Sequence, residues 1–552
     1  MQHQISRISL GLLIALSALC SCNFNNKKAD LILHNATIYS VDDQWTIHQA
    51  MAIQNGKIIA TGTEREILNQ YVAPKIIDCE KKFIYPGLID AHCHFLGYGR
   101  MLNEVDLSET TSYQDVINRV TEYAKTNKKS WIIGRGWDQN DWPDSSFPDR
   151  NKLDSLFPEL PIYLKRIDGH AALANNAALK IAGIEQAIII KGGSIEEKNG
   201  RITGILIDNA MSLVEKYIPA STQDQDKKAL LAAQQNCFAV GLTTVDDAGL
   251  LKKDIDLIKQ LQQSGDLRMR MYVMLSDDTS NFNHYLKAGI DTTPFLTVRS
   301  FKFYADGALG SRGACLMDPY SDLLPVKYNG FLLDSVSHFI TRAIQLKAAG
   351  FQMCTHAIGD SANRVMLNIY GDIIGNEKDH RWRIEHAQVL AQNDISKFGQ
   401  FNIIPSIQPT HATSDMPWAF LRLGTNRVKR AYTYRQLKEQ LGMCALGTDF
   451  PVEDINPLGT FYAAVARKNK LGEPSEGFQS ENALTREDAL RGMTIWAAIA
   501  NFEEHHKGSL EVGKYADFVI LDQDILKCPE GTLLTTNVQS TWIDGKKVFP
   551  KN

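Results

Sequence analysis

Four histidines and an aspartate stand where short apolar runs of this sequence come to an end. His92 and His94 belong to one His-Cys-His run, and His356, His386 and Asp449 each close a later run. Because side chains two apart on a strand point to the same face, the first two imidazoles can reach one ion. Imidazole and carboxylate are typical ligands of zinc or a similar divalent ion, so the pattern predicts a metal site.

A lysine adds to this pattern. Lys302 lies inside the apolar run 299–306 and, on a strand, shares one face with Tyr304 and Asp306. An amine at such a position is costly unless it is paired or neutralised. A buried ion pair and a modified, ligand-bearing lysine are both open at this point.

The elements that must position these residues alternate between strand and helix. We expect eight strands, which end near residues 94, 246, 274, 306, 356, 386, 408 and 449, and helices that include 225–240, 336–349 and 433–441. Such alternation is typical of a parallel α/β sheet, and eight βα units is the count of a TIM (β/α)8 barrel. Since the active sites of these barrels lie at the carboxyl ends of the strands, the candidate ligands would surround one mouth.

Two further parts flank the barrel, which we place at residues 86–505. The gap between its first two strands is too long for a barrel loop, so roughly residues 100–225 are expected to form an inserted subdomain over the mouth. Residues 31–85 and 506–552 contain short strand-like runs, with a hairpin signal at Asn55-Gly56. We expect these two segments to combine into one split β-sandwich domain.

Together these motifs resemble the amidohydrolase superfamily. The resemblance rests on the run from Pro86 to His94, PGLIDAHCH, on the flanking β segments and on the later His, His and Asp. Three more runs are similar to amidohydrolase family 3, the group of YtcJ-like proteins and N-substituted formamide deformylases: GWDQ at 136–139, KFYADGALGSR at 302–312 and GTDFPV at 447–452.

This resemblance implies a binuclear centre with two divalent ions, expected to be Zn²⁺. One ion would be held by His92, His94 and Asp449, the other by His356 and His386, with Lys302, carboxylated at Nζ, as the bridge. It implies hydrolysis of a non-peptide C–N bond in a small molecule by a metal-activated hydroxide, with Asp449 as proton acceptor and then donor. Deamination or lactone hydrolysis at the same site is an alternative, as is a binding lipoprotein without catalysis.

Three more residues are expected to contact the substrate. His170 lies in the insert, Arg312 follows a flexible Gly-Ser pair, and Trp137 could form a wall of the pocket. For each there is a structural alternative: a hydrogen-bonded loop histidine, an ion pair and simple packing. Asp306 is expected to order the metal ligands from behind.

The first residues indicate export. Residues 1–21 combine one positive charge, the apolar stretch 8–19 and the run LCSC at 19–22, which resembles a bacterial lipoprotein signal peptide. We expect Cys22 to carry lipid and residues 22–30 to form a tether, which would anchor the protein to a membrane of the cell envelope. An ordinary cleaved signal is the alternative, and the apolar stretch is too short to span a core of ~30 Å.

Composition excludes several other classes. The 552 residues include 59 Lys and Arg against 63 Asp and Glu, so there is no basic excess and no nucleic-acid partner is expected. Nine scattered cysteines without a CxxC pair do not form a disulfide scaffold. The expected partner is a small amide-like substrate, and a homodimer is an open alternative to a monomer.

Overall fold

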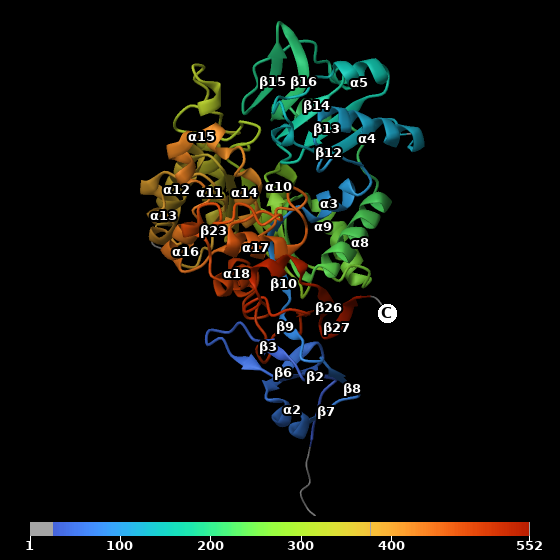
Figure 1. The fold of residues 1–552 in the computed structure, drawn as a ribbon, viewed down its shortest axis with the longest axis vertical. Helices are drawn as coiled ribbons and strands as arrows, with labels where there is room; N and C mark the ends of the chain where they lie inside the picture. The colour runs from blue at the N-terminus through green and yellow to red at the C-terminus, as the bar shows by residue number, and fades with distance from the viewer. Residues whose placement is uncertain (1–25, 128, 376, 551–552) are drawn as a thin grey trace, which may run out of the picture.

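The computed structural model describes residues 26–127, 129–375 and 377–550 and shows a mixed α/β fold (Figure 1). Strands from both ends of the chain lie at one end of the long axis, a parallel barrel occupies the middle, and the insert lies at the other end. The expected leader, including Cys22, lies outside the described residues. No helix in the described part is long and apolar enough to cross a membrane.

Eight parallel strands form the barrel and confirm the predicted (β/α)8 fold class. They follow each other around the barrel in chain order: β10 (Leu88–Cys93), β17 (Leu242–Leu250), β18 (Arg270–Ser276), β20 (Leu296–Tyr304), β21 (Gln352–Ala357), β22 (Arg383–His386), β23 (Ile404–Ile407) and β24 (Ala445–Leu446). A short strand, β19 (Asp291–Thr292), pairs with β20 outside this path. Most of the barrel strands are buried along their whole length, as expected for a parallel sheet that helices cover.

The helices that surround the barrel begin and end at local signals. They include α8 (Gln223–Ala239), α9 (Lys252–Gln263), α11 (Val336–Ala349), α12 (Asp360–Ile374), α16 (Tyr434–Leu441) and α17 (Pro457–Ala466). Thr222 and Gln225 form a capping box at the start of α8. Gly350 ends α11 with a φ of 73°, a left-handed conformation that glycine adopts without strain.

The last barrel strand is shorter than the sequence indicated. β24 ends at Leu446, and residues 447–449 turn toward the first strand instead of continuing the ladder. Thr448 donates from its N–H and its hydroxyl to the carboxylate of Asp90, at 3.0 and 2.7 Å. A Cβ at Gly447 would lie 2.5 Å from the backbone nitrogen of His92, so only glycine permits this close approach of the two segments. The turn carries Asp449 to the mouth of the barrel.

The insert forms a six-stranded sheet of its own. Its order is β11 (Val105–Asp106), β12 (Ile132–Trp137), β13 (Ile162–Arg166), β14 (Ala171–Ala174), β16 (Arg201–Asp208) and β15 (Gly193–Lys198). Helices α4 (Tyr113–Thr126), α5 (Asn151–Leu156) and α6 (Asn176–Ala182) accompany this sheet. Two separate clusters of buried apolar side chains belong to the insert, so its packing is largely its own.

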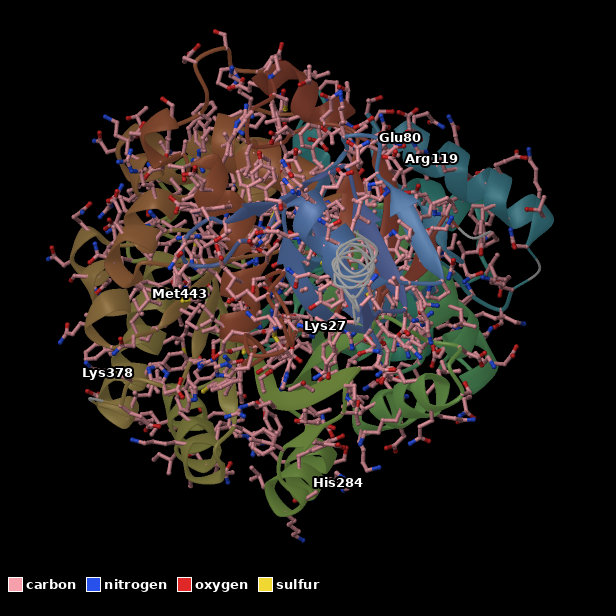
Figure 2. All side chains as sticks on the ribbon, turned by 90° about the horizontal axis from the view of Figure 1, so that it is seen from below. Lys27, Glu80, Arg119, His284, Lys378 and Met443 are labelled. Atoms are coloured by element: carbon pink, nitrogen blue, oxygen red, sulfur yellow. The ribbon has the colours of Figure 1, made fainter. Side chains whose placement is uncertain are left out.

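The two ends of the chain meet in one sheet. β25 (Phe518–Leu521) lies between β9 (Phe83–Pro86) and β26 (Val538–Ile543), and β3 (Thr37–Tyr39), β4 (Ile47–His48) and β27 (Lys546–Phe549) extend this sheet. A second sheet contains β6 (Lys57–Gly62), β5 (Ala50–Gln54), β2 (Leu31–His34) and β8 (Lys75–Asp78). Seen from below, these strands lie across the bottom of the barrel, with Lys27 and Glu80 on this side (Figure 2).

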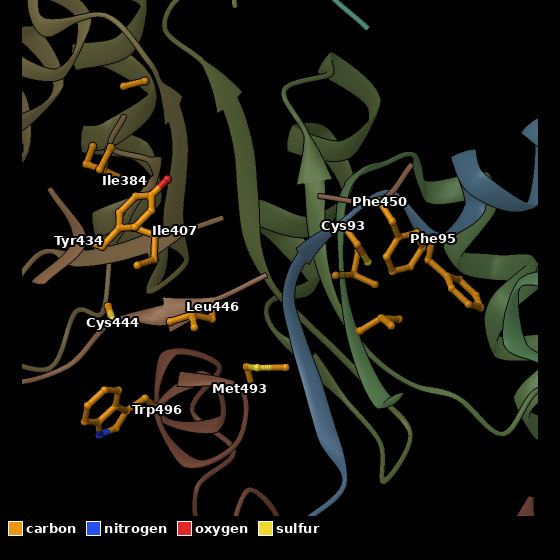
Figure 3. Close-up of a cluster of buried hydrophobic side chains, with 14 of the residues drawn as sticks. Cys93, Phe95, Ile384, Ile407, Tyr434, Cys444, Leu446, Phe450, Met493 and Trp496 are labelled. Atoms are coloured by element: carbon orange, nitrogen blue, oxygen red, sulfur yellow. The ribbon is translucent and has the colours of Figure 1, made fainter. Parts of the chain in front are cut away.

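Apolar side chains fill the space between the barrel and its helices (Figure 3). Cys93, at the end of β10, and Phe95, at the start of α3 (Phe95–Met101), lie beside Phe450 from the loop after β24. The seven cysteines in the described part are all free, and Cys93, Cys354 and Cys444 are buried in the barrel. Buried thiols of this kind pack as small apolar groups.

A buried cation joins the barrel to the sheet of the chain ends. Arg270 of β18 is fully buried, and its Nη2 donates to Asp517 Oδ1 at 2.9 Å. It also pairs with Asp544, and its guanidinium lies 4.0 Å from the ring centroid of Tyr515. Since both carboxylates come from the end of the chain, this ion pair fixes residues 515–544 to the barrel.

Replacing Arg270 by Met should destabilise the protein, because Asp517 is then buried without its partner. Removing one partner of a buried ion pair costs about 3–5 kcal/mol. The midpoint of urea unfolding, followed by circular dichroism at equal metal loading, measures the change. Arg268→Met is the matched control, since Arg268 donates a single bond of 3.3 Å to the Ile543 carbonyl. Equal midpoints for the two variants would contradict the role given to Arg270.

Candidate metal centre

His92 and His94 present the same ring nitrogen to the barrel mouth. Nδ1 of His92 lies 2.6 Å from Glu385 Oε2, and Nδ1 of His94 lies 3.0 Å from the Ala248 carbonyl oxygen. Because both partners accept hydrogen bonds, Nδ1 carries the proton in each ring. Nε2 is then left with a lone pair, the form in which imidazole binds a metal.

Asp449 faces both of these nitrogens. Its Oδ1 lies 3.2 Å from His94 Nε2 and 3.6 Å from His92 Nε2, and it is buried without a hydrogen bond from any described residue. Burial alone would raise the pKa of Asp449, but the neighbouring imidazoles, His94 first, hold it well below its ordinary value. A carboxylate oxygen and two nitrogen lone pairs that face one another are suited to bind a shared cation.

Lys302 reaches the same point from β20. Its side chain is buried, and Nζ lies 3.0 Å from His92 Nε2. Burial lowers the pKa of Lys302 to about 8, against the opposing effect of Glu385 and Asp449. A larger fraction of the amine is therefore neutral near pH 7 than in an exposed lysine, and the neutral amine is the form that can be carboxylated.

His356 and His386 complete the group from β21 and β22. Their ring centroids are 4.6 Å apart, and the ring of His386 is 4.9 Å from that of His92. His386 Nδ1 lies 2.7 Å from Gln408 Oε1, which leaves its Nε2 free for a ligand. Burial lowers the pKa of both histidines well below the ordinary value, so both are neutral and able to bind a metal.

The donor set fits one or more divalent ions. The ligand atoms of His92, His94 and Asp449 all lie within 4.8 Å of one another, and the same is true of His386, His411 and Asp449. The two groups share Asp449 but draw on different histidines. Nitrogen and oxygen donors of this kind are typical ligands of zinc.

Three polar residues behind the ligands were not predicted from the sequence. Glu385 is fully buried, holds His92 and pairs with Arg383 at 2.9 Å. Burial would raise the pKa of Glu385, but Arg383 and then His92 lower it to about 2, so it stays charged. Gln408 holds His386 in the same way. The run Arg383-Ile384-Glu385-His386, which places three polar side chains at a predicted strand end, was the available signal.

His411 is a further residue that the sequence analysis missed. It lies on α14 (Pro409–Asp415), directly after β23, and its ring stacks on His386 with centroids 5.8 Å apart. Its Nε2 is buried without a hydrogen-bond partner in the described part and lies 3.7 Å from Asp449 Oδ2. His411 therefore has a free nitrogen at the centre, but it lies on the helix that follows β23 and not at the strand end, where the other candidate ligands were found.

Of the three residues predicted to contact the substrate, His170 lies at the centre and the other two have partners elsewhere. His170 is brought to the centre: its ring lies 4.9 Å from that of His356, and Asp208 holds its Nδ1 at 2.6 Å. Arg312 donates to Asp322 at 2.7 Å, and the indole nitrogen of Trp137 donates to the Leu164 carbonyl at 2.8 Å within the core of the insert. Neither side chain has a contact with the metal-site residues, and their roles toward substrate remain predictions.

Asp306 lies close to His356, and its role in ordering the ligands stays a prediction. Its carboxylate accepts the backbone N–H groups of Ile358 and Gly359 at 3.0 and 2.8 Å, and it lies 3.6 Å from His356 Nε2. Desolvation by burial raises the pKa of Asp306 to about 7. The carboxylate thereby joins the end of β20 to the loop that follows β21.

Replacing Glu385 by Gln should weaken metal binding about 10- to 100-fold, since partners behind a ligand contribute to affinity by about this amount. The metal retained during titration with a chelator, measured by mass spectrometry, gives the change. Glu503→Gln is the matched control, because Glu503 is a buried glutamate that pairs with Lys507 at 2.7 Å away from the centre. Metal affinity equal to that of the control would contradict the role of Glu385.

Comparisons with known proteins agree with this geometry. The amidohydrolase family model matches residues 75–549. The chain is 33% identical to the protein LONG AFTER FAR-RED 3 of Arabidopsis thaliana, over 95% of this chain and 92% of that protein. It is 26% identical to the N-substituted formamide deformylase of Arthrobacter pascens, over 94% of this chain and 97% of that enzyme.

A solved structure is similar over the same extent. An uncharacterized metal-dependent hydrolase from Pyrococcus horikoshii superimposes with a TM-score of 0.73 and 27% identity, and the match covers 91% of this chain and 99% of that one. The family match and the formamide deformylase confirm the resemblance inferred from the motifs. With candidate metal ligands gathered at the mouth of a (β/α)8 barrel, the chain belongs to the amidohydrolase family and is a hydrolase of that family.

Proposed function

We propose that this hydrolase cleaves the C–N bond of a small, non-peptide amide at a binuclear metal centre. The observation that carries the proposal is the buried, unpartnered Oδ1 of Asp449, which two imidazole nitrogens face at 3.2 and 3.6 Å. The name of the formamide deformylase, a relative over nearly the whole chain, supports an amide as the substrate.

Two divalent ions, proposed to be Zn²⁺, would share the six expected ligands. His92, His94 and Asp449 would hold one ion and His356 and His386 the other, with carboxylated Lys302 between them. When bound, such ions lower the pKa of water and polarise a carbonyl group. Carboxylation would turn the buried amine of Lys302 into an anionic ligand, which explains why a lysine is tolerated at a fully buried position.

The chain itself would move the proton and orient the substrate. The carboxylate of Asp449 is placed to take a proton from the attacking water and return it to the leaving nitrogen. Glu385 and the Ala248 carbonyl hold the rings of His92 and His94 in one tautomer. The free Nε2 of His411 can donate to or accept from a substrate atom beside Asp449.

Two alternatives use the same residues differently. Deamination of a ring or hydrolysis of a lactone requires the same centre, and a binding lipoprotein would keep the fold without turnover. The complete set of six ligand positions favours catalysis over binding. Attachment to the cell envelope through lipid on Cys22 is a separate proposal, which the run at 19–22 supports.

A substrate panel tests the proposed reaction. Purified protein, loaded with Zn²⁺, is assayed against formamides, N-acyl amino acids, cyclic amides, lactones and ring amines. We expect release of an amine from an amide, loss of this activity after chelation, and its return on adding Zn²⁺. Turnover of lactones or ring amines alone would replace the amide assignment, and binding of metal without turnover of any class would favour the binding lipoprotein.

Replacing Asp449 by Asn should lower kcat by at least about 100-fold, since the amide cannot accept the proton. Most of the bound metal should remain, because the histidines are unchanged. Kinetics and metal analysis of the same preparation measure both quantities. Asp454→Asn is the control, because Asp454 is an exposed aspartate nearby that accepts the Asn456 N–H. Full activity of Asp449→Asn would remove this residue from the mechanism.

Replacing Lys302 by Met should lower the metal content from two ions to at most one per chain. Met keeps much of the volume of the side chain but cannot carry a carboxylate. Metal analysis after gel filtration measures the stoichiometry, and circular dichroism checks that the fold is kept. Two tightly bound ions in Lys302→Met would show that this lysine is not the bridge.

A further inference from the structure

Arg135 is a cation of the insert that pairs with no acidic side chain of the residues that the structure describes. It lies on β12, and its Nε and Nη2 donate to the Ile167 carbonyl at 3.3 and 3.0 Å. These two bonds use one edge of the guanidinium. The opposite edge, formed by Nη1 and the second N–H of Nη2, has no partner within the described ranges.

The fully buried arginine of the insert, Arg166, behaves differently. Arg166 pairs with both Asp138 and Asp168, and the partly buried Arg150 pairs with Asp154 at 3.0 Å. No carboxylate of the described residues lies within 4.0 Å of the Arg135 guanidinium. Arg135 is only partly buried, so the unpaired edge of its guanidinium is open to an anion that comes from outside the chain.

The position of Arg135 links it to the metal centre. The carbonyl that it holds, at residue 167, begins the loop that carries His170 to within 4.9 Å of the His356 ring. Burial lowers the pKa of Arg135, and Asp449 opposes this effect more than any other carboxylate, before Asp168 and Glu104. Arg135 is therefore within electrostatic reach of the proposed reacting groups.

The surroundings of Arg135 are partly open to solvent. A Cβ at Gly169 would lie 3.2 Å from Arg135 Nη2, so the glycine keeps this side of the guanidinium clear. Tyr304, whose ring centroid is 6.2 Å from that of His170, is 37% exposed although its neighbours Lys302 and His356 are buried. Solvent therefore enters the space beneath the loop at 167–170.

We propose that Arg135 binds a carboxylate of the substrate, so that the amide that is cleaved carries an acid group, as in an N-acylated amino acid. The free guanidinium edge matches the two oxygens of a carboxylate, and the pair would neutralise the cation. Arg312, the arginine that the sequence favoured for such a contact, already pairs with Asp322. The inference rests on the proposed function for the reaction but concerns a separate group of the substrate.

Matched substrate pairs test this assignment. N-formyl amino acids of both configurations are compared with the corresponding N-formyl amino alcohols, which differ only in CH₂OH for the carboxylate. We expect the wild-type protein to prefer the acid by roughly 10- to 100-fold in kcat/KM, the range for a charge-assisted pair of hydrogen bonds. Arg135→Gln should remove this preference, mainly by raising KM for the acid. Arg135→Lys should keep part of it, because lysine retains the charge but lacks the paired donors of the guanidinium.

Arg119→Gln is the matched control. Arg119 is an exposed arginine of the insert, labelled in Figure 2, that donates to two backbone carbonyls, those of Asp106 and Ser108. Its replacement should leave the preference for the acid unchanged. Equal rates for acid and alcohol in the wild type, or an unchanged preference in Arg135→Gln, would overturn the assignment. Stronger preference for phosphonate analogues would overturn the carboxylate as the class.

A binding arm separates this inference from the proposed reaction. Binding of the same acids and alcohols to the Asp449→Asn variant is measured by calorimetry, with and without the additional Arg135→Gln change. Tighter binding of the acid that depends on Arg135 supports the inference even if no amide is hydrolysed. Equal binding of acid and alcohol refutes it, whether or not amides are hydrolysed.

Discussion

The seam between the first and last barrel strands is the constraint on which the proposed centre depends. His94 N donates to the Phe450 carbonyl and Asp449 N to the His92 carbonyl, both at 2.8 Å. These bonds connect residues more than three hundred positions apart in the sequence, and the carboxylate of Asp90 secures the same turn through Thr448. The metal-site carboxylate thus reaches the two histidines because the barrel closes at this place.

A chain of buried polar groups runs through the barrel to this seam. Asn501 donates to Asp246 at 2.7 Å, Arg383 pairs with Asp246 at 3.1 Å and with Glu385 at 2.9 Å, and Glu385 holds His92. Each charge would be unfavourable alone in a low-dielectric interior, and each is compensated by the next. The orientation of His92 is therefore set by contacts that begin well away from the mouth.

The insert supplies what the barrel strands do not. It brings His170 close to His356, and Arg135 donates to the Ile167 carbonyl at the start of the same loop. Its apolar clusters are its own, so the loop is positioned by a separately packed sheet. In the proposed reaction, the barrel would supply the chemistry and the insert would select the substrate group that lies beside it.

The sequence by itself determined the local features of this protein. Strand periodicity placed His92 and His94 on one face, alternation of strand and helix indicated eight βα units, and an unfavourable lysine in an apolar strand marked position 302. These conclusions depend on residues a few positions apart, so they can be drawn from the sequence alone. Glu385, His411 and Arg135 were not identified from the sequence, because their roles depend on which side chains from distant parts of the fold contact them. Only the tertiary structure shows that Arg312 pairs with Asp322 and that Arg135 pairs with no acidic side chain of the described residues. The reason is that these contacts join residues far apart in the sequence, which local spacing does not encode.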